Sequence, residues 1–245
     1  MVQKNAKDEI KTMDKHLPLW VMIIIPIYAG VFLSLLTFPI ASDWGWLEGW
    51  AFIITFAINI GLSYFYINKN NPRVLRNRIK IKKEGLTTAT KKSAGSDKCI
   101  MPFTGLGFIG AMILPGLDYR YGWTSIPFAV EMIGLAAVNA GAIIMDIAIL
   151  QNSYASKLLD IKQGQKLVDT GLYAHVRHPL YSGAILLALA LPIALGSWWG
   201  LIPAVVFALT MLVRIKFEEE MLEKGMDGYA DYQTRVRYKL LPKIY

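Results

Sequence analysis

Long apolar blocks alternate with short polar segments along most of the chain. A helix needs about 20 apolar residues to span the hydrocarbon core of a membrane. Blocks of about this length predict membrane helices at 19–41, 44–67, 99–117, 123–151, 181–195 and 198–215. Gly196 and Ser197 alone separate the last two blocks, which indicates a tight helical hairpin. The pattern predicts an all-α polytopic membrane protein with about six transmembrane helices.

The amino-acid composition agrees with lipid as the solvent. Hydrophobic residues make up 54% of the chain and charged residues 18%, whereas soluble domains carry about 25% charged residues. The first apolar block is too long for a signal peptide, so we expect it to remain in the mature protein. Cys99 is the one cysteine of the sequence, which rules out a disulfide within the chain.

The distribution of positive charge predicts the topology. The net charge is +8, and of the 26 Lys and Arg residues all except Arg120 lie in 1–18, 68–98, 152–179 and 214–245. These four segments share one side of the membrane if both termini are cytosolic, as the positive-inside rule requires. We therefore predict cytosolic termini, a basic cytosolic loop at 68–98, and a location in the inner membrane of a prokaryotic cell. Topology and anionic lipids explain the charge without a nucleic-acid partner.

Polar residues interrupt the fourth apolar block at Glu131, Asn139 and Asp146. Ionisable groups in membrane helices usually face a cavity or a polar partner. Asn139 and Asp146 fall on nearly the same helix face. The residues therefore predict either the wall of a polar cavity or a set of interhelical hydrogen bonds, and the sequence leaves both open.

The third apolar block contains Gly105, Gly107 and Gly110, formally a G-x-G-x-x-G motif. A dinucleotide site requires this motif between a strand and a helix. Inside an apolar helix, small residues instead let neighbouring helices approach closely. We therefore expect helix packing here.

The segment Lys166–Tyr181 combines aromatic and charged residues that suit a small polar ligand. Pro179 fits the first turn of the fifth helix, and His178 precedes it, where a ligand carboxylate would be favourable. His175 fits an interfacial residue near lipid phosphate. His175 and His178 lack a nearby third ligand, so we expect no metal site.

A second polar segment follows the sixth apolar block. Arg214 and Glu218 are four residues apart and share one helix face. A guanidinium at this position can bind a carboxylate through two parallel hydrogen bonds. A surface ion pair with an anchoring arginine is the alternative reading of the same spacing.

Together these segments resemble a known family. The motifs follow one another as Gly171-Leu172-Tyr173, Arg177-His178-Pro179-Leu180-Tyr181, Arg214 with Glu218, Glu219 and Leu222, Tyr229 with Tyr232, and Arg235-Val236. Their order and spacing resemble the isoprenylcysteine carboxyl methyltransferases, which are related to the phospholipid methyltransferases. The resemblance covers about the last 80 residues of the chain, and upstream of them hydropathy alone agrees.

The resemblance implies binding of S-adenosylmethionine under a cytosolic C-terminal cap and methylation of a lipid-like or prenylated acceptor, with membrane lipids as neighbours. Carried over by motif, the cofactor contacts would be Lys166, Leu167, Val168, Tyr173, His178, Pro179, Tyr181 and Glu218. Arg214 would face the acceptor, and Arg214 and Glu218 would be catalytic. The implied division is a four-helix part at 1–151 and a methyltransferase core at 152–245.

The sequence departs from the family pattern in two places. Leu180 stands where the eukaryotic members commonly carry a small polar residue. The family's polar cofactor-binding residue upstream of the loop maps to either Gln151 or Asn152. These departures concern the acceptor more than the cofactor.

Other activities fit parts of the same sequence. A phospholipid N-methyltransferase would need a base, for which Glu218, Glu219 or His178 would serve. A membrane sterol reductase that binds a nicotinamide cofactor has a C-terminal pattern similar to 235–242. A transporter or scaffold would use Glu131, Asn139 and Asp146 along a path through the membrane. The acceptor and the oligomeric state stay open.

Overall fold

The computed structural model describes residues 16–72, 74–76, 95–152 and 166–244. Each predicted apolar block forms a helix: α2 (Leu19–Ala41), α3 (Leu47–Asn70), α5 (Gly95–Tyr121), α6 (Phe128–Gln151), α7 (Pro179–Ala194) and α8 (Leu201–Gly225). A 3₁₀ turn, η1 (Gly171–Ala174), precedes α7, and a short helix, α9 (Tyr229–Arg235), follows α8. Across the described ranges there is no strand, which confirms the all-α class. The predicted loop 68–98 and core 152–245 lie partly outside these ranges.

Four segments are long and apolar enough to cross a membrane: α2, α3, Ile100–Tyr121 of α5, and α6. The α7 helix has 16 residues, and α8 carries Arg214, Lys216 and Glu218. Crossing by these two helices therefore stays a prediction. Large apolar side chains of α2, such as Ile27 and Leu35, are exposed, as expected where lipid replaces water around a helix. The chain is a membrane protein.

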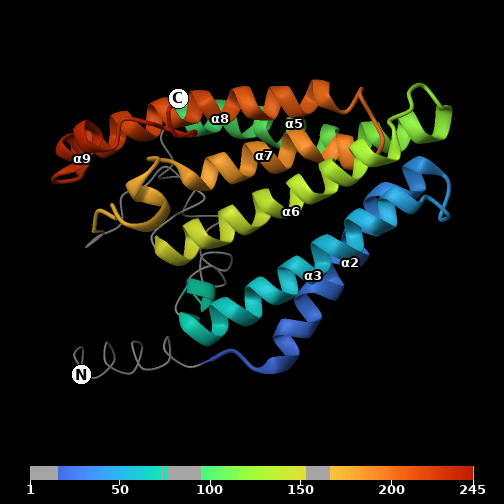
Figure 1. Ribbon diagram of the computed structural model, residues 1–245, viewed down its shortest axis with the longest axis horizontal. Helices are drawn as coiled ribbons and strands as arrows, with labels where there is room; N and C mark the ends of the chain where they lie inside the picture. The colour runs from blue at the N-terminus through green and yellow to red at the C-terminus, as the bar shows by residue number, and fades with distance from the viewer. Residues whose placement is uncertain (1–15, 73, 77–94, 153–165, 245) are drawn as a thin grey trace.

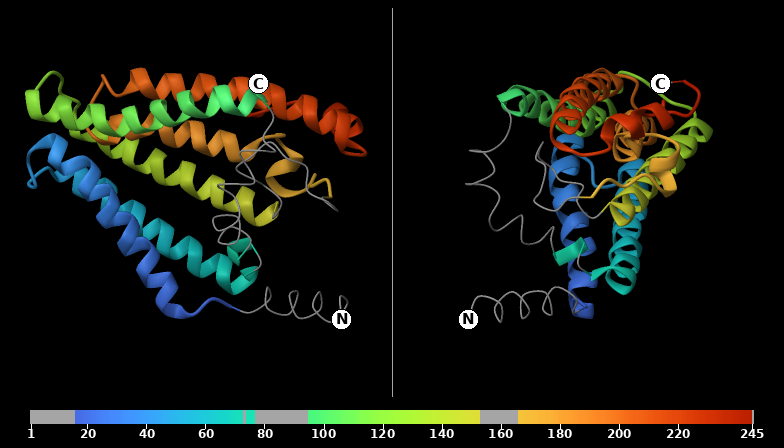
Figure 2. Two further views of the ribbon diagram at one scale, coloured as in Figure 1. Left: turned by 180° about the vertical axis from the view of Figure 1, so that it is seen from behind. Right: turned by 90° about the vertical axis from the view of Figure 1, so that its left-hand side faces the viewer.

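The helices form two groups that share one core (Figures 1 and 2). The α2 and α3 helices pair with each other, and α6 lies between α3 and α7. The α5 helix runs along α8, as the rear view in Figure 2 shows. Phe38, Trp46, Phe52, Met112 and Leu191 belong to one buried cluster, so residues from both groups stabilise the arrangement.

Glycines allow the closest helix contacts. A Cβ atom on Gly141 would lie 2.7 Å from the Gly183 carbonyl oxygen, so α6 and α7 touch along their backbones. A Cβ on Gly107 would lie 2.7 Å from the Phe207 backbone nitrogen of α8. The predicted packing role of the Gly105–Gly110 motif is therefore confirmed at Gly107.

The polar residues of α6 form hydrogen bonds with α3. Asn139 donates through Nδ2 to Thr55 Oγ1 at 3.4 Å and to the Leu135 carbonyl at 2.9 Å. The Ser63 hydroxyl donates to the carboxylate of Asp146. Of the two readings that the sequence left open, these contacts favour interhelical hydrogen bonding over a cavity wall.

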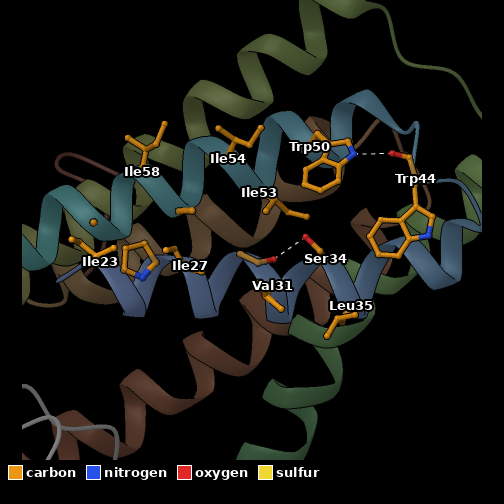
Figure 3. A pocket seen from close by; sticks show the side chains of 14 residues that line it. Ile23, Ile27, Val31, Ser34, Leu35, Trp44, Trp50, Ile53, Ile54 and Ile58 are labelled. Atoms are coloured by element: carbon orange, nitrogen blue, oxygen red, sulfur yellow. Dashed lines mark hydrogen bonds between the residues drawn. The ribbon is translucent and has the colours of Figure 1, made fainter. Parts of the chain in front are cut away.

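An apolar groove of about 680 Å³ runs between α2 and α3 (Figure 3). Its walls carry residues such as Ile27, Leu35 and Ile58. The polar groups at its edge are satisfied locally, since Ser34 Oγ donates to the Gly30 carbonyl at 2.8 Å. The groove therefore presents hydrocarbon to the surrounding lipid.

One end of the bundle is closed by Asp118, at the turns that join α5 to α6 and α7 to α8. Its side chain is 1% exposed. It accepts hydrogen bonds from the Thr124 backbone nitrogen at 2.8 Å, from the Thr124 hydroxyl and from the Ser197 hydroxyl. Ser197 Oγ in turn accepts from the Gly200 backbone nitrogen at 3.2 Å. Uncharged donors of the two turns thus bind the same Asp118 carboxylate, which connects the turns.

Candidate active site

The opposite end, here the α9 end, is where α6 and α8 finish and α7 begins (Figure 1). His178 caps α7 and Pro179 occupies its first turn, where the fixed φ of proline suits a helix start. The backbone nitrogens of Arg177 and His178 donate to the carbonyls of Tyr238 and Lys239, each at 2.9 Å. Residues 236–240, here the C-terminal segment, therefore lie across the start of α7.

Glu219 is buried beneath this segment among basic side chains. Arg177 Nε and Lys239 Nζ each lie 2.7 Å from its carboxylate oxygens, and His178 Nε2 lies 3.2 Å away. Burial alone raises the pKa of the Glu219 carboxyl, but the hydrogen bonds from His178, Arg177 and Lys239 outweigh burial and lower the pKa to about 2. The carboxylate is therefore ionised at neutral pH and balances its basic neighbours.

Glu218 and Arg214 meet on the next face of α8, around Tyr181. The Tyr181 hydroxyl donates to Glu218 Oε2. The guanidinium carbon of Arg214 lies 5.9 Å from the centre of the Tyr181 ring, and its Nη1 lies 3.9 Å from the sulfur of Met101. Arg214 is 7% exposed, so a surface anchoring arginine does not describe it. The structure brings together Tyr181, Arg214 and Glu218, as the motifs predicted.

Tyr173 connects α6 with α9 beside this cluster. Its hydroxyl donates to the Ala148 carbonyl at 3.4 Å, and its own carbonyl accepts from the Tyr232 hydroxyl at 2.7 Å. Burial raises the pKa of Tyr173 to about 12, despite a hydrogen bond with Asn152, and the charge of Glu218 adds to the rise. Tyr173 therefore carries a neutral hydroxyl at physiological pH.

The turn before α7 depends on Gly171, whose φ is +62°. This left-handed conformation favours glycine. A Cβ there would also lie 2.3 Å from the Gln151 amide nitrogen. Gln151 accepts a hydrogen bond from the Leu172 backbone nitrogen at 2.8 Å. The sequence left Gln151 and Asn152 as candidates for the family's polar cofactor-binding residue. Both contact η1, Gln151 through Leu172 and Asn152 through Tyr173.

The predicted cofactor residues Lys166, Leu167 and Val168 lie near α9. Leu167 packs against the buried cluster of Tyr229 and Tyr232. Lys166 is exposed and Val168 is half-buried. Leu167 therefore supports α9, and the predicted contact of the triplet with a cofactor stays a prediction.

The sequence did not single out Lys239 and Ser182, and it offered Glu219 as a member of the family motif and as a candidate base, without a contact to the C-terminal segment. Ser182 Oγ donates to the Leu240 carbonyl at 2.7 Å, and Lys239 contacts Glu219. The adjacent acidic residues Glu218 and Glu219 could have indicated a separate contact for Glu219. Adjacent residues of a helix point about 100° apart and therefore meet different partners. No local pattern indicates the partners of Lys239 and Ser182.

Comparisons with known proteins support the expected relationship. Residues 126–226 match the phospholipid methyltransferase family. These residues include α6, η1, α7 and all of α8, and so contain Tyr181, Arg214, Glu218 and Glu219. The match agrees with the expected relationship to the membrane methyltransferases. It covers the part of the chain that builds the candidate site.

Two individual proteins are also similar to this chain. A Δ14-sterol reductase of Methylotuvimicrobium alcaliphilum is 33% identical over 93 residues, which are 37% of this chain and 22% of that protein. The match thus spans about a fifth of that relative. A solved structure of the eukaryotic intramembrane Ras methyltransferase, isoprenylcysteine carboxyl methyltransferase, aligns at a TM-score of 0.44 and 16% identity. The alignment covers 92% of this chain and 85% of that one.

Proposed function

We propose that the protein transfers a methyl group from S-adenosylmethionine to a lipid-like carboxylate acceptor in the membrane. The observation that carries the proposal is the cluster of buried Tyr181 and Arg214 with half-buried Glu218, which lies within the segment that matches a methyltransferase family. We further propose that this cluster faces the cytosol, as the charge distribution predicts.

The residues at the α9 end fit the proposed cofactor. S-adenosylmethionine carries ribose hydroxyls and an ammonium group, both of which donate hydrogen bonds. The Glu218 carboxylate is an acceptor for such donors, and the Tyr181 hydroxyl holds that carboxylate in place. Buried aromatic rings of Tyr173 and Tyr181 offer surface for the adenine. We assign Arg177 to the fold, since Glu219 and the carbonyls of Val236 and Arg237 already engage it.

Arg214 supports an anionic acceptor. A carboxylate beside a buried guanidinium gains a charge-assisted hydrogen bond and a fixed orientation. When bound, S-adenosylmethionine supplies a methyl group on a sulfonium, and a carboxylate can take that group without losing a proton first. The work left to the side chains is to hold the acceptor in line and to exclude water.

The test is the substitution Arg214→Lys, which keeps the charge and removes the planar fork. A charge-assisted hydrogen bond contributes about 1.5–3 kcal/mol, so methyl transfer to a prenylcysteine analogue should fall roughly 10- to 100-fold. Cofactor affinity should stay unchanged. Lys216→Met removes an exposed cation from the same helix and is the matched control. Full activity of Arg214→Lys would remove Arg214 from the acceptor site.

The family match also favours a second candidate, methylation of a phospholipid amine. A protonated amine must lose its proton before it can accept a methyl group, so its rate should rise between about pH 6 and 9. A carboxylate acceptor should show no such rise. Parallel assays with the prenylcysteine analogue and an aminophospholipid across this pH range separate the two reactions.

Similarity to the sterol reductase favours a third candidate, reduction of a lipid by a nicotinamide cofactor. Calorimetric titration of the purified protein with S-adenosylmethionine and with reduced nicotinamide cofactor decides between the classes. Binding of the first supports methyl transfer. Binding of the second, without the first, would replace the proposal by a reductase.

A further inference from the structure

The C-terminal segment contacts α7 through many groups that are distant in sequence. Its Tyr238 and Lys239 carbonyls accept from the backbone of Arg177 and His178. Arg177 Nη1 donates to two further carbonyls of the segment, those of Val236 at 2.7 Å and Arg237 at 2.9 Å. The segment ends with Leu240 buried against Tyr181, Phe207 and Met211. The segment therefore packs into the same buried cluster as Tyr181.

Glu219 connects these contacts to the candidate site. It binds Arg177 and Lys239, the two cations that hold the segment, and it contacts the His178 ring. The His178 ring lies 5.7 Å from the ring of Tyr181, and Tyr181 holds Glu218. A single carboxylate thus lies between the C-terminal segment and the residues proposed to bind the cofactor.

We propose that Glu219 is a positioning residue, which fastens the C-terminal segment over the start of α7 and so keeps Tyr181 and Glu218 in their binding geometry. The effect of Glu219 on cofactor binding rests on the proposed function. The effect of Glu219 on the position of the C-terminal segment does not depend on that function. Without the carboxylate, Arg177 and Lys239 lose the anion that each of them contacts at 2.7 Å. Like charges that lie close together repel in a low dielectric, and Lys239 belongs to the C-terminal segment, so this repulsion moves the segment away from α7.

The first experiment measures the segment itself. Leu240→Cys, made in a Cys99→Ser background, places a thiol at a position that is 8% exposed. Adding Glu219→Gln should raise the rate of maleimide labelling about tenfold or more, because the thiol becomes reactive when the segment lifts. Glu220→Gln changes the exposed neighbour on the same helix and should leave the rate unchanged. Equal rates in the Glu219→Gln and Glu220→Gln proteins would overturn the proposal.

The second experiment separates positioning from catalysis. Glu219→Gln should raise the KM for S-adenosylmethionine roughly tenfold while kcat at saturating cofactor stays within about threefold, the pattern expected when ground-state and transition-state binding weaken together. Lys239→Met should give a similar KM effect. The double variant should be no worse than the more affected single variant, since both act through one contact. A loss confined to kcat, or full additivity of the two substitutions, would contradict the role.

The two proposals can fail separately. Faster labelling in a protein that does not bind S-adenosylmethionine would keep Glu219 as the anchor of the segment and remove the methyltransferase function. Unchanged labelling in an active methyltransferase would keep the proposed function and remove Glu219 as the anchor of the segment. If Glu219→Gln does not fold, Lys239→Met tests the same contact from a side chain that is 29% exposed.

Discussion

Glu219 and Asp118 are buried carboxylates at opposite ends of the helix bundle, and different chemistry surrounds each of them. Glu219, at the α9 end, is held by Arg177, Lys239 and His178. Asp118, at the opposite end, is held by hydroxyl and backbone donors of Thr124 and Ser197. Both carboxylates tie together segments that are far apart in sequence.

The contacts of Glu219 depend on opposite charges, whereas those of Asp118 depend on hydrogen bonds from uncharged donors. The hydroxyls around Asp118 join two tight turns and lie away from the predicted cofactor residues. The cations around Glu219 hold the C-terminal segment beside Tyr181 and Glu218. We therefore expect substitutions at the Asp118 end to change stability, and substitutions at the Glu219 end to change stability and ligand binding together.

The largest expected effect is that of Arg177→Met. It removes one partner of a buried ion pair and two hydrogen bonds to the C-terminal segment. Breaking a buried pair from one side costs about 3–5 kcal/mol, so the melting temperature in detergent should fall markedly and cofactor affinity with it. The control is Arg235→Met, since the pair of Arg235 with Asp169 is largely exposed and contributes at most about 1 kcal/mol. Equal losses in both variants would mean that burial does not distinguish the pairs.

Asp118→Ala should have the next largest effect, on stability alone. The substitution leaves the buried donors of Thr124 and Ser197 without their acceptor, which costs about 1–3 kcal/mol. Thermal unfolding should show this loss, whereas titration calorimetry should show unchanged affinity for S-adenosylmethionine. Asp43→Ala, at an exposed carboxylate on the same end, provides the control. A loss of cofactor affinity in Asp118→Ala would abolish the proposed division between the ends.

The pH dependence of stability should identify the charge-dependent end. The pKa of Glu219 is lowered from 4.5 to about 2 by its basic partners. Since the folded-state pKa lies below the unfolded-state value, the contribution is complete above about pH 4.5 and is lost as the pH falls towards 2. The stability difference between wild type and Glu219→Gln should therefore shrink by about half or more by pH 3. A difference that stays constant from pH 7 to pH 3 would show that charge does not hold the C-terminal segment.

The smallest expected effect is that of Asp146→Leu, between the two ends. Its contact with Ser63 joins α3 to α6, and an interhelical hydrogen bond of this kind contributes about 0.6 kcal/mol. Stability should change little and methyl transfer should be unaffected, with Ser63→Ala as the matched partner. Loss of activity with an intact fold would instead revive the interpretation of Asp146 as part of a cavity wall.

The apolar pattern predicted most of the fold correctly. The block at 19–41 is α2 within the same bounds, because Pro18 precedes it and the polar residues Ser42 and Asp43 follow it. The sixth block differs, since the predicted membrane segment ended at 215 and the helix continues to Gly225. The charged residues that end the apolar run, mostly Glu and Lys, are good helix formers. These residues therefore end the apolar part of α8, but the helix itself continues through them.

The motifs predicted which residues of the candidate site lie close together within α8 and at the start of α7. Arg214 and Glu218 share a helix face by spacing alone, and Tyr181 joins them as the family resemblance implied. Spacing could not show that Arg214 is buried, because burial depends on α5, which contributes Met101. The choice between an anchoring arginine and a site residue therefore needed the packed helices.

By itself, the sequence determined the membrane environment, the order of the helices and the identity of the groups able to bind a charged ligand, because these follow from local hydropathy and helix periodicity. The tertiary structure alone decided which partner each carboxylate meets. Glu218 and Glu219 are adjacent and chemically identical, yet one meets Tyr181 and the other meets Arg177, which is 42 residues away. Contacts of that range arise only when the chain has folded back on itself, and no local pattern encodes them.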